Sequence, residues 1–370
     1  MCVTVREWSL KCTMHHLFFI PLTTTLHISY VALNFRSMSD KQNDCLPEDP
    51  TWPELKLSHC MYTQTVRDIH AVIENEWDSV KLSACQTAAG RALWKHVIND
   101  PFAEILAGET YLRSLFEKMM KDRLNKAREI SGVILAVRTL WFDSKIEAAL
   151  DSFGGGETQV VLLGAGMDTR AYRLGCLKDC SVIEVDLPEV LEVKATLLHS
   201  AMSSKIEHCQ DVILAKSLTR VAADLTHIDW LARLQSSGFV PDKNTIWVLE
   251  GILYYLSQSK AMDVLKIIAD SCAITRTVLL ADFMNKASTT LSSSTYQFYS
   301  DWPEDLLPPL GFSDVKLTQI GDPDAHFGLL HDPMNLFNKL RSLSRSIQTD
   351  PENGAPCRRL YLVQASGSPI

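Results

Sequence analysis

The residues best suited to chemistry stand where short apolar runs end. Gly164-Ala165-Gly166 follows the run Val160–Leu163, and Asp186 follows the run Cys180–Val185. Glycines permit positive φ angles and let a ligand approach the backbone closely. An acid 20 residues beyond Gly166 is spaced to accept hydrogen bonds from the hydroxyls of a ribose. The spacing therefore predicts that a nucleoside binds here.

Two alternatives remain open at this point. Asp186 is also placed to cap a helix that Pro188 opens, with Glu189 as the partner of a capping box. The kind of nucleoside is narrowed by Thr169, which occupies the position of the third glycine in a dinucleotide fingerprint. This loop favours a ligand without phosphates, such as S-adenosylmethionine, over the pyrophosphate of a nicotinamide-dependent oxidoreductase.

The elements that position these residues form an α/β pattern. Further short apolar runs occur at Arg220–Ala223, at Ile246–Leu249 and at Val278–Ala281, the last ending in Asp282, and helical segments alternate with them. Val315–Ile320 and residues 360–364 are predicted to be two later strands. The pattern predicts a mostly parallel sheet covered by helices, and ligands of such sheets bind at the carboxyl ends of the strands.

The chain divides by composition into three regions. Residues 51–155 have helical periodicity and are predicted to form a helical cap, and residues 156–370 are predicted to form the nucleoside-binding domain. Residues 286–310 carry Ser, Thr and Pro and are predicted to be an insertion or a lid over the site. Residues 1–50 are predicted to be an N-terminal extension, either disordered or arising from a misassigned start, with Met38 as a more ordinary beginning; organelle targeting by residues 1–37 is the alternative.

Charge and cysteine content narrow the environment. The net charge of −8 disfavours binding of bulk nucleic acid or an anionic membrane. The apolar stretch Leu17–Leu33 is marginal for crossing a bilayer, so no stable membrane insertion is expected. The ten cysteines contain no CxxC pair, which predicts reduced thiols of a cytoplasmic protein and no metal site.

A series of motifs resembles the leucine carboxyl methyltransferase family of S-adenosylmethionine-dependent methyltransferases, in particular its broad bacterial and plant branch. The motifs are TAAGRALWKHVINDPFAEIL (87–106), VRTLWFD (137–143), VVLLGAGMDTRAYRL (160–174), EVDLPEV (184–190), AADL (222–225), LEGILYYL (249–256) and RRLYLVQASG (358–367). The resemblance covers roughly residues 60–370. It implies the class I methyltransferase fold, a Rossmann-like, doubly wound sheet of seven mostly parallel strands with an N-terminal helical cap.

The resemblance also implies cofactor-binding roles. Gly164 is expected to line the methionyl part of S-adenosylmethionine, and Asp186 to hold the ribose hydroxyls. Asp224 and Leu225 are expected to border the adenine. Glu250 is expected near the amino group of the methionyl part. Arg138 is expected to clamp the carboxylate of the cofactor through two hydrogen bonds.

The expected reaction is methyl transfer to a carboxylate, or to a hydroxyl, of a small molecule or a protein C-terminus. A carboxylate needs no general base, which fits the absence of a recognisable catalytic set; His227 is a candidate base for a hydroxyl, although it is expected to be a solvated loop residue. A lysine that the family carries in the N-terminal helices has no match near residues 88–91, where Arg91 is a candidate substitute. An oxidoreductase, or an inactive scaffold of the same fold, is the alternative.

Overall fold

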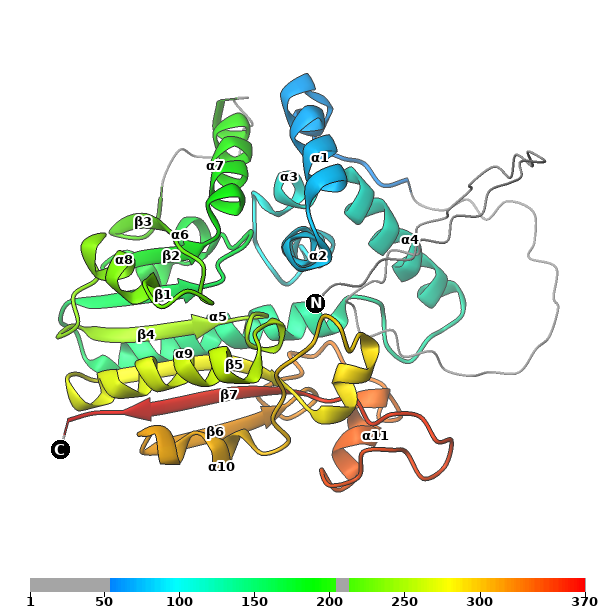
Figure 1. Ribbon diagram of the computed structural model, residues 1–370. Coiled ribbons are helices and arrows are strands. Elements are labelled where there is room, and N and C mark those ends of the chain that lie inside the picture. Colours follow the sequence, from blue (N-terminus) through cyan, green and yellow to red (C-terminus); the bar gives the residue numbers. More distant parts are fainter. Residues whose placement is uncertain (1–53, 204–212, 370) are drawn as a thin grey trace, which may run out of the picture. The chain divides into compact units, whose positions relative to one another are not determined.

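The computed structural model describes residues 54–203 and 213–369, which belong to one compact unit (Figure 1). The predictions for residues 1–50, including the targeting alternative, lie outside the described residues. The prediction that the domain boundary lies at residue 155 stays a prediction.

A seven-stranded sheet forms the centre, in the order β3-β2-β1-β4-β5-β7-β6. The first five strands are parallel, and β7 runs antiparallel between β5 and β6. This confirms the predicted fold class. The strands are β1 (Thr158–Leu163), β2 (Ser181–Asp186), β3 (Ser217–Ala222), β4 (Asn244–Leu249), β5 (Thr277–Met284), β6 (Asp314–Gln319) and β7 (Leu360–Gly367).

One strand runs further than its sequence pattern predicts. The run Val278–Ala281 was expected to end in Asp282, but β5 continues through Asp282 to Met284. Its pairing with β7 extends over these residues, with Asp282 opposite Leu362. Asp282 is therefore a residue inside a buried strand, and its carboxylate must find partners within the protein.

Helices cover both faces of the sheet. Figure 1 shows α8 and α9 in front of the strands and α5 behind them, where α5 packs against β4, β5 and β7. The helices are α1 (Gln64–Glu76), α2 (Ser79–Leu93), α3 (Ala103–Ala107), α4 (Glu109–Leu124), α5 (Val133–Phe153), α6 (Arg170–Arg173), α7 (Pro188–Ser203), α8 (Trp230–Ser236), α9 (Gln258–Asp270), α10 (Pro303–Leu306) and α11 (Leu336–Ser342).

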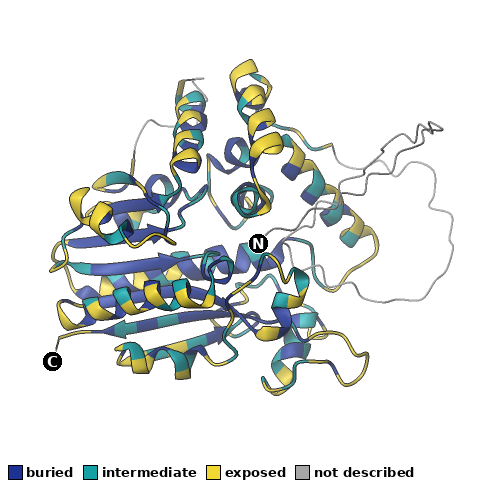
Figure 2. Cartoon of the chain, viewed as in Figure 1, coloured by how far each residue is buried: buried dark blue, intermediate teal, exposed yellow. Residues whose placement is uncertain are grey.

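The hydrophobic core lies between the sheet and these helices, so the strands are mostly buried in Figure 2. Alternate side chains of each strand point to opposite faces, so Trp247 of β4 packs against the ring of Trp230 in α8 while its neighbours face α5. Strand β5 is buried along its whole length. A strand buried on both faces needs the near-continuous apolar runs that the sequence contains.

The N-terminal helices pack on one another and on the sheet domain. Helix α2 contacts α3, α4 and α5, and α1 and α3 contact α7. Asp78 starts α2, because its carboxylate accepts hydrogen bonds from the backbone N–H groups of Val80 and Lys81. The helical layer thus approaches the end of the sheet where β1 and β2 finish.

Candidate cofactor and active site

Four of the predicted residues stand at the carboxyl ends of the first four strands. Gly164 follows β1, Asp186 ends β2, Asp224 comes two residues after β3, and Glu250 follows β4. These strands are parallel and neighbours in the order β3-β2-β1-β4. Adjacent strands lie about 4.8 Å apart, so the structure brings all four residues to one edge of the sheet.

The glycine turn after β1 has a backbone that side chains would disrupt. Gly164 has a φ of +67°, and a Cβ placed there would lie 2.8 Å from Cγ1 of Ile252. A Cβ on Gly166, at φ +45°, would lie 3.0 Å from the Cβ of Ala84 in α2. The N–H of Gly164 donates to the carbonyl of Val185 at 2.9 Å, which fixes the turn to the end of β2. The turn is therefore held against the end of β2, and its two glycine positions leave no room for a Cβ.

Asp186 binds that turn. Its Oδ2 accepts the N–H of Gly166 at 2.6 Å, and its Oδ1 accepts the N–H of Leu187 at 2.7 Å. Helix α7 begins only at Pro188, so the hydrogen bonds of Asp186 go to the turn and to its own neighbour rather than to the first turn of the helix. Burial raises the pKa of Asp186, and the two N–H groups oppose this effect. Each carboxylate oxygen keeps a lone pair for a further hydrogen bond, and a contact with a ribose stays a prediction.

The segment after β3 is a local turn. Oδ1 of Asp224 accepts the N–H of Thr226 at 2.8 Å, and Oδ2 lies 3.8 Å from Nε2 of His227. The His227 side chain is 70% exposed, as its interpretation as a solvated loop residue predicts. Leu225 is buried in the core beside Val221. Contacts of Asp224 and Leu225 with adenine stay a prediction.

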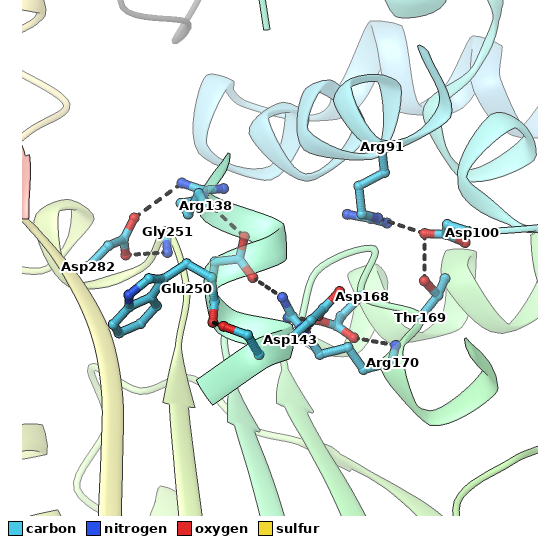
Figure 3. A network of polar contacts seen from close by, with 12 residues as sticks. Arg91, Asp100, Arg138, Asp143, Asp168, Thr169, Arg170, Glu250, Gly251 and Asp282 are labelled. Atoms are coloured by element: carbon cyan, nitrogen blue, oxygen red, sulfur yellow. Dashed lines mark hydrogen bonds and ion pairs between the residues drawn. The ribbon is translucent and has the colours of Figure 1, made fainter. Parts of the chain in front are cut away.

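Glu250 is held by two guanidinium groups. Its Oε1 accepts from Nε of Arg138 at 3.0 Å, and its Oε2 accepts from Nη2 of Arg170 at 2.7 Å (Figure 3). Burial would raise the pKa of Glu250, but Arg170 and then Arg138 outweigh burial and lower it. Glu250 is therefore ionised, and it orients both arginines.

Arg138 has one nitrogen to spare. Its Nη1 donates to Oδ2 of Asp282 at 3.2 Å and to the hydroxyl of Tyr254 at 3.3 Å, while Nε binds Glu250. Within residues 54–203 and 213–369, Nη2 makes no hydrogen bond, and it is not among the fully buried atoms. A ligand carboxylate at Arg138 would thus be gripped through Nη2.

These groups belong to a larger ion-pair network. Arg170, 2% exposed, contacts the carboxylates of Asp143, Asp168 and Glu250. Arg173 links Asp143 to Asp100, which also binds Arg91. The members of the network are Arg91, Asp100, Arg138, Asp143, Asp168, Arg170, Arg173, Glu250 and Asp282.

The network has a formal charge of −1 when every member is ionised, because it holds four arginines and five carboxylates. Burial would raise the pKa of Asp168, yet the arginines and Lys194 around it, Arg170 foremost, lower it to about 2. Buried charges must be paired, and here the pairing leaves a single negative charge beside the glycine turn. A cationic ligand complements this charge.

Sequence reasoning identified Arg138 and Glu250 and offered Arg91 in place of a family lysine, but it assigned no role to Asp100, Asp143, Asp168, Arg170 or Arg173. Asp143 lies in VRTLWFD and Arg170 in GAGMDTR, two of the motifs already quoted, so a search for charges within those motifs would have found them. Arg91, the candidate substitute for the missing lysine, binds Asp100 at 2.7 Å and the carbonyl of Met167. It supports the glycine turn, and a direct cofactor contact stays a prediction.

Three tyrosine rings meet beside the network. The ring of Tyr254 lies 4.8 Å from that of Tyr255 and 5.6 Å from that of Tyr296. The N–H of Gln297 donates to the carbonyl of Tyr254 at 2.9 Å, so the 286–310 segment contacts the turn after β4. Burial raises the pKa of all three phenols, which stay protonated at neutral pH.

The part of the chain that the structure describes contains no group of three or more His, Cys, Asp or Glu side chains that could hold a metal ion. Among the same described residues, none of the helices has the length and apolar character that spanning a membrane requires.

With this geometry in hand, comparisons with known proteins decide the family. The family model described as "Leucine carboxyl methyltransferase" matches residues 84–269, half of the chain, including the glycine turn, Asp186 and Glu250. The chain belongs to this family. The predictions of a methyltransferase and of S-adenosylmethionine as its cofactor are confirmed with it.

Several proteins with a methyltransferase description are similar to this chain. This methyltransferase is 32% identical over 243 residues to a "Putative S-adenosyl-L-methionine-dependent methyltransferase" of Mycobacterium tuberculosis, a match covering 60% of this chain and 73% of the other. A protein of Mycobacteroides abscessus with the same description is 34% identical over 203 residues, or 50% and 61% of the two chains. A solved structure of a putative methyltransferase from Thermobifida fusca is 12% identical, with a TM-score of 0.43, and the match covers 71% and 90%.

Proposed function

We propose that this methyltransferase transfers the methyl group to a carboxylate oxygen of its acceptor, which is a small molecule or the C-terminus of a protein, and so forms a methyl ester. When bound, S-adenosylmethionine supplies a methyl group that its sulfonium has already activated. The observation that carries the proposal concerns the titratable groups around Arg138. The carboxylates of Glu250 and Asp282 are bonded to this arginine, and the phenols of the three tyrosines stay protonated.

The charges and hydrogen-bonding groups at this edge of the sheet suit the cofactor. Asp186 would hold the ribose hydroxyls, Asp224 and Leu225 would border the adenine, and Gly164 would line the methionyl part. S-adenosylmethionine carries one net positive charge, and the adjacent ion-pair network carries −1. Nη2 of Arg138 has free donors for the cofactor carboxylate, and Glu250 offers negative charge for its amino group.

A carboxylate acceptor suits the groups that surround it. Its oxygen is nucleophilic as it arrives at neutral pH, so the protein needs only to align it and to exclude water. Glu250 and Asp282 are each bonded to Arg138, and the phenols of Tyr254, Tyr255 and Tyr296 keep their protons. These phenols are suited to donate hydrogen bonds to an anion rather than to remove a proton.

A hydroxyl acceptor would require a base elsewhere. His227 follows β3, which is separated from β4 by two strands. Three strand spacings amount to about 14 Å, so an imidazole at that end does not serve an acceptor beside Glu250. This separation favours the carboxylate.

The test uses the full chain and a tritiated methyl donor. Calorimetry should first show that S-adenosylmethionine and S-adenosylhomocysteine bind. Incubation with a cell extract should then give labelled product from which mild base releases methanol, as from an ester. A base-stable label would refute the carboxylate acceptor, and the absence of cofactor binding would refute the site itself. Asp263→Asn, a change at an exposed residue of α9, serves as the control variant.

A further inference from the structure

Asp282 is a fully buried carboxylate that joins two elements of the site. Its Oδ1 accepts the N–H of Gly251 at 2.7 Å, in the turn after β4. Its Oδ2 accepts from Nη1 of Arg138, in α5, at 3.2 Å (Figure 3). The side chain is 0% exposed, and both oxygens are engaged. Neither the family resemblance nor the motif analysis gives Asp282 a role.

We propose that Asp282 is a positioning residue for the cofactor: its ionised carboxylate holds Arg138 in the orientation in which Nη2 binds the amino-acid carboxylate of S-adenosylmethionine. The proposal rests on the proposed function, which assigns that contact to Arg138. A planar guanidinium is fixed by two anchors, and Glu250 on Nε and Asp282 on Nη1 provide them. Nη2 is the nitrogen that these anchors leave available.

The charges around Asp282 make this device sensitive to pH. Arg138 faces it from α5, Glu250 from the turn after β4, and Tyr254 and Tyr255 from the 3₁₀ turn η3 (Leu253–Tyr255). Burial, assisted by Glu250, raises the pKa of Asp282 to about 6 against the opposing effect of Arg138. Below this pH the protonated carboxyl is a poorer acceptor for Nη1, and the anchor weakens.

Two ligands distinguish the titration of Asp282 from that of Asp186. S-adenosylhomocysteine and 5′-methylthioadenosine share the adenosine that Asp186 would hold, but only the first has the amino-acid carboxylate. Any titration of Asp186 acts on both ligands and cancels in the ratio of their dissociation constants. Calorimetry of the wild-type protein at about pH 7.5 and about pH 5 should show that the preference for S-adenosylhomocysteine falls about tenfold at the lower pH. A constant ratio would overturn the proposal.

The matched variant is Asp282→Asn, which keeps the shape but turns an N–H group toward Arg138 or Gly251. At about pH 7.5 it should weaken S-adenosylhomocysteine about tenfold, change 5′-methylthioadenosine less than about twofold, and abolish the pH dependence of the ratio. In an Arg138→Gln background the same change should add less than about twofold, because the effect passes through the guanidinium.

The other outcomes are equally decisive. An equal loss for both ligands would mean that Asp282 only stabilises the fold and would overturn the proposal. If Asp282→Asn does not fold, the wild-type pH comparison still decides. If the wild-type protein binds neither ligand, the proposed function fails, which is a different result from a wild-type protein that binds both with a ratio independent of pH.

Discussion

Replacing Arg170 by glutamine should destabilise the protein severely, because this guanidinium contacts three carboxylates and is 2% exposed. Removing one partner of a buried ion pair costs about 3–5 kcal/mol. An independent estimate comes from Asp168, whose pKa is lowered from 3.8 to about 2. At about 1.4 kcal/mol per unit, that shift corresponds to about 2–3 kcal/mol of stability at neutral pH, and Arg170 is its main favourable cause.

The sign of the pH dependence follows from the same shift. A carboxyl with a lowered pKa in the folded state contributes stability above its unfolded pKa and loses it as the pH falls toward about 2. Without Arg170 the carboxylates of Asp168 and Glu250 lack the cation that lowers their pKa values most, so these folded pKa values rise. The deficit of the variant should therefore be smallest near pH 2 and grow as the pH rises toward neutrality.

Urea denaturation followed by tryptophan fluorescence at about pH 5 and about pH 7.5 measures this. Arg233→Gln is the control, since Arg233 pairs with Asp229 at 2.7 Å but is 57% exposed, and its loss should cost less than about 1 kcal/mol. If Arg170→Gln stays within about 1 kcal/mol of the wild type, or if its deficit does not change with pH, the buried network does not act as described.

Two further variants probe the edge of the sheet. Asp186→Ala should weaken S-adenosylhomocysteine by about 2–3 kcal/mol in calorimetry, and unchanged affinity in a folded variant would limit Asp186 to supporting the turn. Gly164→Ala should lower the free energy of unfolding by about 1–3 kcal/mol, because the new Cβ meets Ile252 at a φ of +67°. Gly175→Ala, with nothing within 4 Å, is the matched control, and equal losses for the two variants would contradict the argument from crowding.

The strands and the edge residues were predictable because their signals are local. A buried parallel strand is a short apolar run, and Gly164 and Asp186 follow directly after such runs. The glycines were predictable from residue type alone, because a turn with positive φ angles is costly for other residues.

The ion-pair network was not predictable in this way. Arg138 is 112 residues from Glu250 and 144 from Asp282 along the chain, and only the folded sheet brings them together. Charged residues are mostly exposed to solvent, so a sequence alone predicts a solvated side chain at each of these positions. The extension of β5 through Asp282 was not predictable for a related reason. A carboxylate after an apolar run indicates the end of a strand unless its arginine partner is known.

The antiparallel β7 between β5 and β6 has a consequence for how the protein is made on the ribosome. Strand β6 pairs with β7 alone in the described sheet, yet β7 follows it by 41 residues. At about 5–20 residues per second, β6 must wait about 2–8 s for its partner to be translated. During that delay the flank of β5 is an open template for a neighbouring chain, so newly synthesised molecules need protection from one another until β7 has been inserted.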